Sequence, residues 1–319
     1  MTKTKNTSTL AIIIAYLLIY IVWGSTYFFI HIALQGFSPF LLGAVRFTTA
    51  GILLLIWCGK MKEPIWNKQL IKTAAITGIL LLFIDMGLVM KAQQYLPSSL
   101  IAIVAASTAI WILLLDKKMW KINFRNWNTI LGVLIGFIGV ILLFSEQLAT
   151  SFTETGVSNQ AIGMCLLILG TLSWASGSVY SKYSVLPNGV TFANAAWQML
   201  IAGALFWIAS FVHGDVQRFN VQVVPHVSYL AIGYLIIFGS ILAFTSYIWL
   251  LKVRPATEVS THAYVNPLVA VFLGSTFANE QITLIQIIGL TIILCGVAMI
   301  NLVKVKKRDK QMKPLCPEQ

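Results

Sequence analysis

The sequence predicts an all-α integral membrane protein, with ten transmembrane helices in two inverted five-helix repeats around a central cavity. The chain of 319 residues is 58% hydrophobic and only 10% charged, whereas a soluble domain carries about 25% charged residues. Apolar runs of about 20 residues, the length that crosses a bilayer, recur from end to end. A pattern of residues in the first half also returns in the second half.

Ten apolar runs are predicted to cross the membrane, with short connections between them. The first five are Leu10–Leu34, Pro39–Trp57, Gln69–Met90, Pro97–Leu115 and Trp127–Phe144. The second five are Ala161–Tyr183, Thr191–Val212, Val227–Leu251, Pro255–Phe277 and Ile282–Val303. We interpret the first run as a retained helix and not a signal peptide, because no small-residue cleavage site follows it.

Positive charges sort to one side of the membrane when the N-terminus is placed inside. The inner segments then carry Lys3, Lys5, Lys60, Lys62, Lys68, Lys72, Lys117, Lys118, Lys121, Arg125, Lys182, Lys252, Arg254 and the basic tail, while the outer segments carry Arg218. This bias predicts a multi-pass protein of the cell (inner) membrane with cytoplasmic N- and C-termini. The net charge of +12 therefore reflects membrane sorting and does not indicate nucleic acid.

The internal repeat is carried by residues 151 to 158 positions apart. The matched pairs are Trp23 and Trp174, Phe40 and Phe192, Gly51 and Gly203, Pro97 and Pro255, Gly132 and Gly289, and Gly139 and Gly296. Each half has an odd number of spans, so the second half enters the membrane inverted. We expect one repeat at 1–150, a second at 151–303 and a basic cytoplasmic tail at 304–319. Such folds place a substrate site near the midplane, which favours a transporter.

A polar stripe in the ninth span is the strongest candidate for a site. Glu258, His262 and Asn266 follow one another at helical spacing, so they share one face. Pro267 next to them is predicted to break the helix. Glu258 and His262 are candidates for proton coupling, although the residues themselves favour an acid that stabilises a helix start and a histidine bonded to a neighbouring helix. Asn266 is expected to form hydrogen bonds with the backbone carbonyls that the break at Pro267 leaves without a partner, or with a substrate.

Two charged residues are predicted within the first half's spans. Arg46 and Asp85 lie at similar depths, and a lone buried charge needs a partner. We expect them to meet near the cavity, where Arg46 could accept a substrate carboxylate; a structural ion pair is the alternative. The position equivalent to Arg46 is the neutral Gln198.

Aromatic residues within the spans are candidates for cavity walls. Trp23 and Trp174 are repeat-related, and either lining a cavity or packing between helices would explain them. The same two explanations apply to Tyr27 and Tyr264. Aromatic walls would suit amphipathic or cationic substrates. Small residues beside the tryptophans are equally well explained by close helix packing.

No pattern typical of an enzyme is found. The sequence has no paired-histidine metal helix, no glycine-rich phosphate loop and no GxSxG, so we expect no catalytic residue, no metal and no cofactor. Its four cysteines have no metal-type spacing.

Several segments together resemble the EamA-type members of the drug/metabolite transporter superfamily. They are Trp23–Tyr27, Pro39–Phe40, Arg46–Phe47, Ala50–Gly51, Ala92–Ser98, Arg254–Pro255, Ser260–Thr261, Ala263–Pro267, Gly274 and Glu280. The resemblance covers essentially the whole chain and implies a ten-helix fold with a central cavity. The sequence departs from the pattern at Gln93, where members usually have an acid, at Ala109, where they have proline, and at His262, where an aromatic or apolar residue is expected.

We therefore expect a secondary transporter that moves small organic metabolites, amino-acid-like compounds or drugs by alternating access. The resemblance favours export. The alternatives are a proton-coupled importer or facilitator, a channel and, from another class, a membrane-embedded enzyme. Expected partners are a small-molecule substrate and the lipid bilayer, with protons as a candidate coupling ion and a monomer or homodimer as the assembly.

Overall fold

The computed structural model describes residues 9–151, 159–184, 191–254, 259 and 261–312. Within these residues the secondary structure is entirely helical. The first half contains α1 (Thr9–Leu17), η1 (Leu18–Val22), α2 (Trp23–Ala33), α3 (Pro39–Lys60), α4 (Lys68–Thr77), η2 (Gly78–Ile84), α5 (Asp85–Ala92), α6 (Ser98–Ala105), α7 (Thr108–Leu115), η3 (Lys117–Met119), α8 (Trp120–Asn123) and α9 (Trp127–Ser151).

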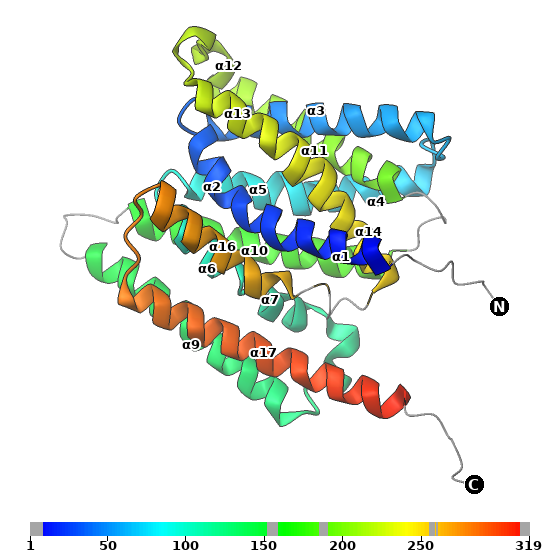
Figure 1. Ribbon diagram of the computed structural model, residues 1–319, viewed down its shortest axis with the longest axis vertical. Helices are drawn as coiled ribbons and strands as arrows, with labels where there is room; N and C mark the ends of the chain where they lie inside the picture. Colours follow the sequence, from blue (N-terminus) through cyan, green and yellow to red (C-terminus); the bar gives the residue numbers. More distant parts are fainter. Residues whose placement is uncertain (1–8, 152–158, 185–190, 255–258, 260, 313–319) are drawn as a thin grey trace.

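The second half continues the same architecture. It contains α10 (Asn159–Tyr183), α11 (Thr191–His213), α12 (Asp215–Arg218), η4 (Val221–Val223), α13 (His226–Tyr234), η5 (Leu235–Phe244), α14 (Thr245–Val253), α16 (His262–Phe277) and α17 (Leu284–Met312). The helices form one bundle, in which α1 begins and α17 ends at the same end (Figure 1).

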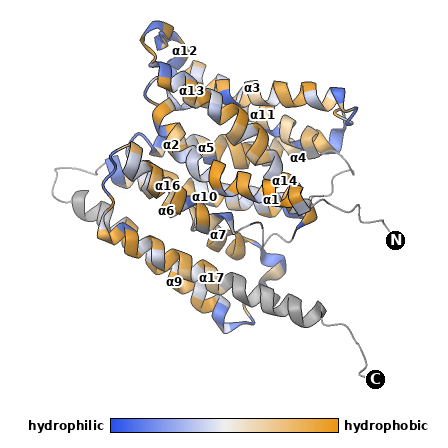
Figure 2. Cartoon of the chain, in the orientation of Figure 1, coloured by the Kyte–Doolittle hydropathy of each residue, from blue (hydrophilic) through white to orange (hydrophobic). Residues whose placement is uncertain are grey.

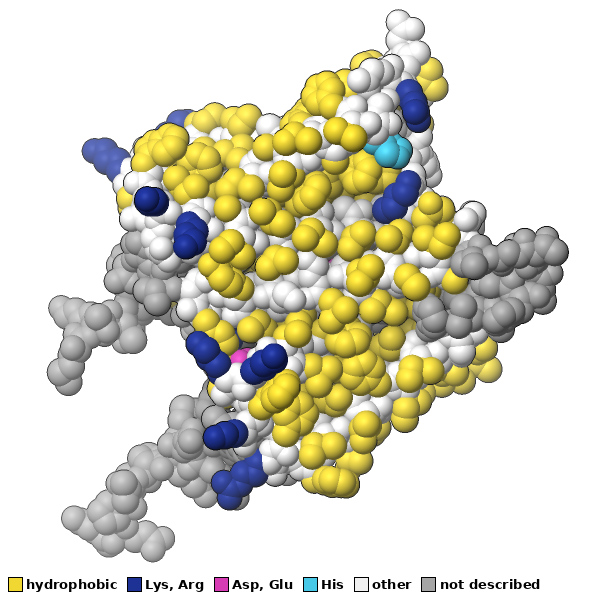
Figure 3. Space-filling view, turned by 180° about the vertical axis from the view of Figure 1, so that it is seen from behind, with side chains coloured by type: hydrophobic (Ala, Val, Ile, Leu, Met, Phe, Trp, Pro, Cys, Tyr) yellow, Lys and Arg dark blue, Asp and Glu magenta, His cyan; other side chains and the backbone are white. Residues whose placement is uncertain are grey.

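Seven helical stretches of the described chain are long and apolar enough to cross a membrane. They are Thr9–Ala33, Pro39–Lys60, Lys68–Ala92, Ser98–Leu115, Asn159–Tyr183, Phe192–His213 and His226–Leu250. Three shorter apolar helices are Trp127–Leu143, Val265–Phe277 and Leu284–Met299. The protein is therefore an all-helical, multi-pass membrane protein. Hydrophilic residues gather toward the ends of the bundle (Figure 2), and a broad hydrophobic surface with lysines and arginines at its borders covers one face (Figure 3).

Local sequence signals explain where several helices begin. Ser38 accepts a hydrogen bond from the Leu41 amide and Pro39 occupies the first turn of α3, where no amide is needed. Asn67 accepts a hydrogen bond of 3.0 Å from the Leu70 amide at the start of α4. These side chains satisfy amides that helix geometry leaves without a partner.

Three of the long stretches contain π-helical turns, which the sequence analysis did not predict. These turns are η1, η2 and η5. The stretch Ser98–Leu115 is divided by a turn at Ala106 and Ser107, although it contains no internal proline or glycine. π-Helical turns often occur at functional sites, because they leave backbone carbonyls outside the regular ladder.

The predicted break at Pro267 is wrong. Pro267 lies inside α16, which is continuous from His262 to Phe277. Because α16 begins only five residues earlier, the missing proline amide removes one intrahelical bond, to the Ala263 carbonyl, and the helix continues. Thr261, directly before α16, lies in a turn.

Two closely packed helix pairs lie at opposite edges of the bundle. Helices α3 and α11 form one, and α9 and α17 form the other (Figure 1). A Cβ at Gly296 of α17 would lie 2.5 Å from the Gly132 carbonyl and 2.7 Å from the Gly136 amide of α9. Glycine therefore permits the close approach of these two helices.

Candidate functional site

Four aromatic side chains from four helices meet inside the bundle. Trp23 at the start of α2 lies with its ring centroid 5.6 Å from Trp174 of α10, 4.9 Å from Tyr247 of α14 and 5.3 Å from His262 of α16. Tyr247 also contacts Trp174 and His262, at 6.0 and 5.8 Å. We call Trp23, Trp174, Tyr247 and His262 the central aromatic cluster. The chain brings together both repeat-related tryptophans and one residue of the polar stripe.

Backbone contacts hold Trp23 in place. Its indole Nε1 donates a hydrogen bond of 3.3 Å to the Gly239 carbonyl in η5. The next residue, Gly24, faces α16, where an added Cβ would lie 2.7 Å from Val269 and 3.0 Å from the Asn266 carbonyl. Tyr247 is buried, whereas Trp23, Trp174 and His262 are only partly buried despite these contacts.

Asn266 links α16 to the π-helical turn of the first span. The amide orientation that satisfies its neighbours has Nδ2 donating to the carbonyls of Ile19 and Tyr20, each at 3.0 Å, and Oδ1 accepting from His262 Nδ1 at 3.2 Å. The Tyr20 hydroxyl also lies 2.5 Å from Thr261 Oγ1. Asn266 therefore bonds backbone carbonyls at η1 and orients the His262 ring.

Arg46 is buried on α3 and pairs with no acid in the part of the chain that the structure describes. Its Nε donates a hydrogen bond of 2.8 Å to Ser240 Oγ in η5, and its guanidinium lies 4.9 Å from the Phe47 ring centroid. Its Nη1 has no hydrogen-bond partner among the described residues. Gly239, whose carbonyl accepts the Trp23 hydrogen bond, also lies beside the Arg46 guanidinium. A Cβ added at Gly239 would lie 3.3 Å from Arg46 Nη2.

Asp85 opens α5 directly after η2 and is 3% exposed. A Cβ at Gly170 of α10 would lie 3.2 Å from its Oδ1, and the Tyr27 hydroxyl is near enough to interact with it electrostatically. In the described part of the chain Asp85 has neither a hydrogen bond nor an ion pair. The expected meeting of Arg46 and Asp85 is therefore wrong, because Arg46 faces η5 while Asp85 faces α10.

The other predicted site residues are placed as follows. Gln198 is fully buried on α11, with its backbone against Gly78 of η2, and neither atom of its side-chain amide has a partner among the described residues. Tyr27 lies one turn after Trp23 on α2. Tyr264 belongs to α16, but its side chain is outside the described residues, and Glu258 lies outside them altogether. No group of histidines, cysteines or acids in the described chain could hold a metal ion.

Glu280 caps the start of α6, a contact that the sequence analysis missed. Its Oε1 accepts from the Ser98 amide and hydroxyl at 2.9 and 2.6 Å, and its Oε2 accepts from the Ser99 amide at 3.0 Å. Burial alone would raise the pKa of the Glu280 carboxyl, but these hydrogen bonds outweigh it and hold that pKa below its ordinary value. Two features of the sequence could have indicated this cap. Glu280 is an acid between two predicted spans, and the helix start at Pro97–Ser99 contains no acid.

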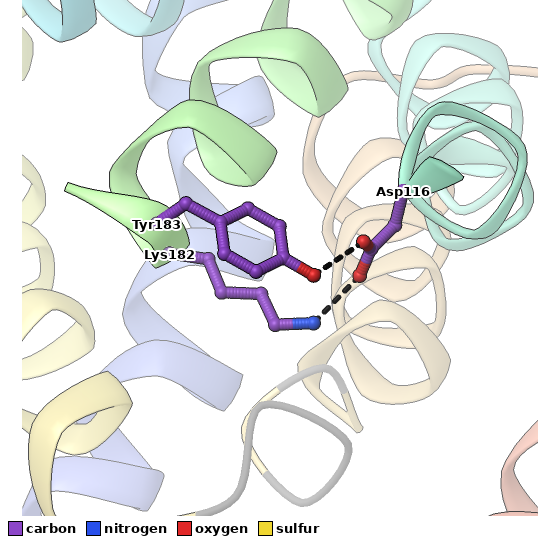
Figure 4. A network of polar contacts seen from close by, with 3 residues as sticks. All are labelled: Asp116, Lys182 and Tyr183. Atoms are coloured by element: carbon purple, nitrogen blue, oxygen red, sulfur yellow. Dashed lines mark hydrogen bonds and ion pairs between the residues drawn. The ribbon is translucent and has the colours of Figure 1, made fainter. Parts of the chain in front are cut away.

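A second polar contact joins the end of α7 to the end of α10. Asp116 is 5% exposed, and its carboxylate accepts from Lys182 Nζ and from the Tyr183 hydroxyl, both at 2.6 Å (Figure 4). The three side chains converge from the two halves of the chain. The contact ties a first-half helix to a second-half helix.

These features define a polytopic helical membrane protein with an aromatic and polar centre. The sequence profile of the EamA-like transporter family matches residues 10–145 and again residues 161–302. The chain belongs to the EamA-like transporter family. The resemblance drawn from its motifs is thereby confirmed, and the family points to a transporter and not an enzyme.

Some curated relatives carry transporter names. The chain is 36% identical over 289 residues to the inner membrane transporter YedA of Escherichia coli (strain K12), covering 90% of this chain and 89% of YedA. It is 27% identical over 296 residues to the protein PecM of Dickeya dadantii, covering 92% and 93% of the two chains. It is 22% identical over 285 residues to the transporter YoaV of Bacillus subtilis, covering 88% and 92%.

A solved crystal structure shares the fold. It superposes with a TM-score of 0.63 at 19% identity and covers 94% of this chain and 99% of the solved chain. The architecture is therefore found over the full length of another protein.

Proposed function

We propose that this protein is a secondary transporter that moves a small organic molecule across the cell membrane by alternating access, with the central aromatic cluster lining the substrate site. The observation that carries the proposal is the composition of the cluster. Trp23 comes from the first half, and Trp174, Tyr247 and His262 come from the second. A relative motion of the two halves would therefore open or close the cluster.

The proposal rests on two inverted five-span repeats, at 1–150 and 151–303, and the packing of the helices supports them. Exchanging each segment for its counterpart converts the contact of α10 with α4 into that of α2 with α13, and the contact of η2 with α11 into that of η5 with α3. The pairs α3 and α11, and α9 and α17, map onto themselves. Such exchange symmetry is what an alternating-access transporter requires.

The π-helical turns support the same repeat. They begin at Gly78 in η2 and at Leu235 in η5, and the two starts have the spacing of the matched residue pairs. Arg46 packs against η5 and Gln198 packs against η2, so equivalent positions face equivalent turns. The two halves therefore share geometry but differ in charge at this position.

The cluster and its surroundings favour an amphipathic substrate with an aromatic part. Three of the four rings remain partly exposed although helices surround Trp23 on several sides. Rings present flat apolar faces and attract cations. The buried Arg46, with one nitrogen unpaired, offers a carboxylate a charged donor. An amino-acid-like compound combines these features, and the family resemblance favours its export.

Proton coupling is a second candidate property of the same transporter. Asp85 is a buried carboxylate without a cation partner in the described chain, and an intramembrane carboxylate of this kind is a natural proton acceptor. His262 lies within the cluster, and Glu258 remains a candidate from the sequence. In this form the protein would be a proton-coupled importer or exporter.

Counterflow in proteoliposomes tests the proposal. The purified protein would be reconstituted and supplied with amino acids, organic anions and aromatic cations, with Trp174→Ala and Arg46→Ala beside the wild type. We expect saturable exchange of one class, recovered unaltered, and weaker exchange with a higher KM in Trp174→Ala while that variant stays folded. Equal exchange by the wild type and both variants would contradict the assigned site. Recovery of a chemically altered substrate would favour an enzyme.

A further inference from the structure

A second candidate binding site lies at one end of the bundle, between α3 and α4. It is a pocket of about 590 Å³ lined by Trp66, Asn67, Lys68, Ile71 and Lys72. We call these residues the basic pocket. The apolar stretch Pro39–Lys60 ends before this pocket, and the stretch Lys68–Ala92 begins at it. The pocket therefore lies where lipid headgroups would meet the protein.

The pocket is held in shape by contacts outside it. Trp197 of α11 donates from Nε1 to the Ile65 carbonyl at 2.8 Å, and its ring lies 5.2 Å from that of Trp66. Asn67 is fixed by its hydrogen bond with the Leu70 amide. Binding would therefore require little ordering of the loop.

The charge of this region is not compensated. Lys68 and Lys72 are exposed one turn apart on α4, and neither forms an ion pair within the described chain. The sequence between residues 60 and 72 holds four lysines and one acid, Glu63. Glu63 is already engaged, because it accepts from the Phe192 and Ala193 amides of α11 and from the Cys58 thiol.

Apolar surface adjoins this charge. Trp66 is 75% exposed, and Ile71 is partly buried beside the lysines. A soluble anion would use the lysines but would gain nothing from an exposed indole. An anionic phospholipid uses both, because its phosphate is negative and its glycerol and first acyl carbons are apolar.

We propose that the basic pocket binds the headgroup of an anionic phospholipid, with the phosphate at Lys68 and Lys72 and the glycerol and first acyl carbons on Trp66 and Ile71. This site shares no residue with the central aromatic cluster and does not depend on the transport proposal.

Lipid titration of the purified protein in detergent tests this. Bound lipid would be counted by native mass spectrometry, and the rise in Tm followed with phosphatidylglycerol, phosphatidylcholine, glycerol phosphate and inorganic phosphate. The variants are the double substitution Lys68→Gln with Lys72→Gln, the single Trp66→Ala, and the matched control Lys117→Gln with Lys121→Gln. The control removes two exposed lysines from the segment between α7 and α9.

We expect phosphatidylglycerol to bind the wild type and the control equally and the double variant about thirtyfold more weakly, since each of the two lysines near a lipid surface contributes about 1 kcal/mol. Trp66→Ala should also weaken binding, and its fold would be checked by circular dichroism. Equal loss in the control would overturn the proposal in favour of general surface charge. An equal rise in Tm with inorganic phosphate would overturn the lipid assignment.

Discussion

Trp23 lies edge-on to Trp174, with ring centroids 5.6 Å apart and ring planes at 81°. The two residues belong to the same Trp–small–Ser pattern in the two halves of the chain. Trp23 and Trp174 are therefore equivalent positions of the two halves, and their rings are in contact within the central aromatic cluster. In the inverted repeat proposed for this chain, equivalent residues would meet only near the axis, so the proposal puts this contact at the centre of the transport path.

Removing one ring of this contact should weaken substrate binding. We expect Trp174→Ala to raise KM for exchange about tenfold, because it removes an aromatic partner of Trp23 and Tyr247 worth about 0.5–1.5 kcal/mol beyond its buried area. The measurement is saturable counterflow across substrate concentrations. Trp57→Ala is the control, because Trp57 is 53% exposed on α3. An unchanged KM in Trp174→Ala would remove the cluster from the site.

The Arg46 contact with Ser240 should stabilise the fold. We expect Arg46→Ala to lower the free energy of unfolding by about 1–3 kcal/mol, since it leaves the buried Ser240 hydroxyl without its partner. Ser240→Ala and the double variant complete a thermodynamic cycle, measured by denaturant unfolding in detergent. Strictly additive effects of the two substitutions would show that the hydrogen bond contributes nothing.

Glu280 should make stability depend on pH in the acid range. Its folded-state pKa is lower than its ordinary value, so the ionised form stabilises the fold above the unfolded-state pKa of about 4.5. That stability is lost as the pH falls through the folded-state pKa. We expect Tm of the wild type to fall more steeply below pH 4.5 than Tm of Glu280→Gln, which should be less stable at pH 7. Parallel profiles of the two proteins would contradict the cap at α6.

Asp116 should tie α7 to α10 with a modest effect on stability. Because the Lys182 side chain is 42% exposed, we expect Asp116→Asn to cost about 1 kcal/mol or less. Hydrogen exchange should nevertheless become faster at η3 and the end of α7, which lose their contact with Lys182 and Tyr183. Lys121→Gln serves as the control, and equal protection in Asp116→Asn and the wild type would show that other contacts hold this end.

The close approach of α9 and α17 should not tolerate a side chain at Gly296. We expect Gly296→Ala to destabilise the protein by about 1–3 kcal/mol, because its Cβ would collide with the Gly132 carbonyl and Gly136 amide of α9. Gly59→Ala is a matched control, since nothing lies within 4 Å of the Cβ that it adds. Similar stability of the two variants would contradict the packing of this pair.

Apolar length was sufficient to predict seven helical stretches of membrane-crossing length, because a bilayer demands long apolar segments and tolerates few alternatives. The orientation inferred from positive charge stays a prediction. The motifs from Trp23 to Glu280 were likewise sufficient for the family. The turn at Ala106 and Ser107 and the π-helical turns could not be predicted. Neither proline nor glycine lies in that turn or in η1, and the single glycines of η2 and η5 do not by themselves indicate a π-helix.

Site geometry was harder to predict than fold. Depth along a span placed Arg46 and Asp85 at one level, but depth does not fix the direction in which a helix residue points. Arg46 faces η5 and Asp85 faces α10, so they do not pair. The repeat pattern was a better guide, because it singled out Trp23 and Trp174, which the structure brings into contact.

The most direct test of alternating access at the cluster is the accessibility of position 262. A His262→Cys variant, with the native cysteines replaced, would be exposed to a membrane-impermeant thiol reagent from either side of oriented vesicles. The account predicts labelling from each side, slowed by a transported substrate, and no labelling of a cysteine at the lipid-facing Leu53, which water does not reach. Labelling from neither side, or labelling that no transported substrate slows, would contradict a central site that opens in turn to both sides.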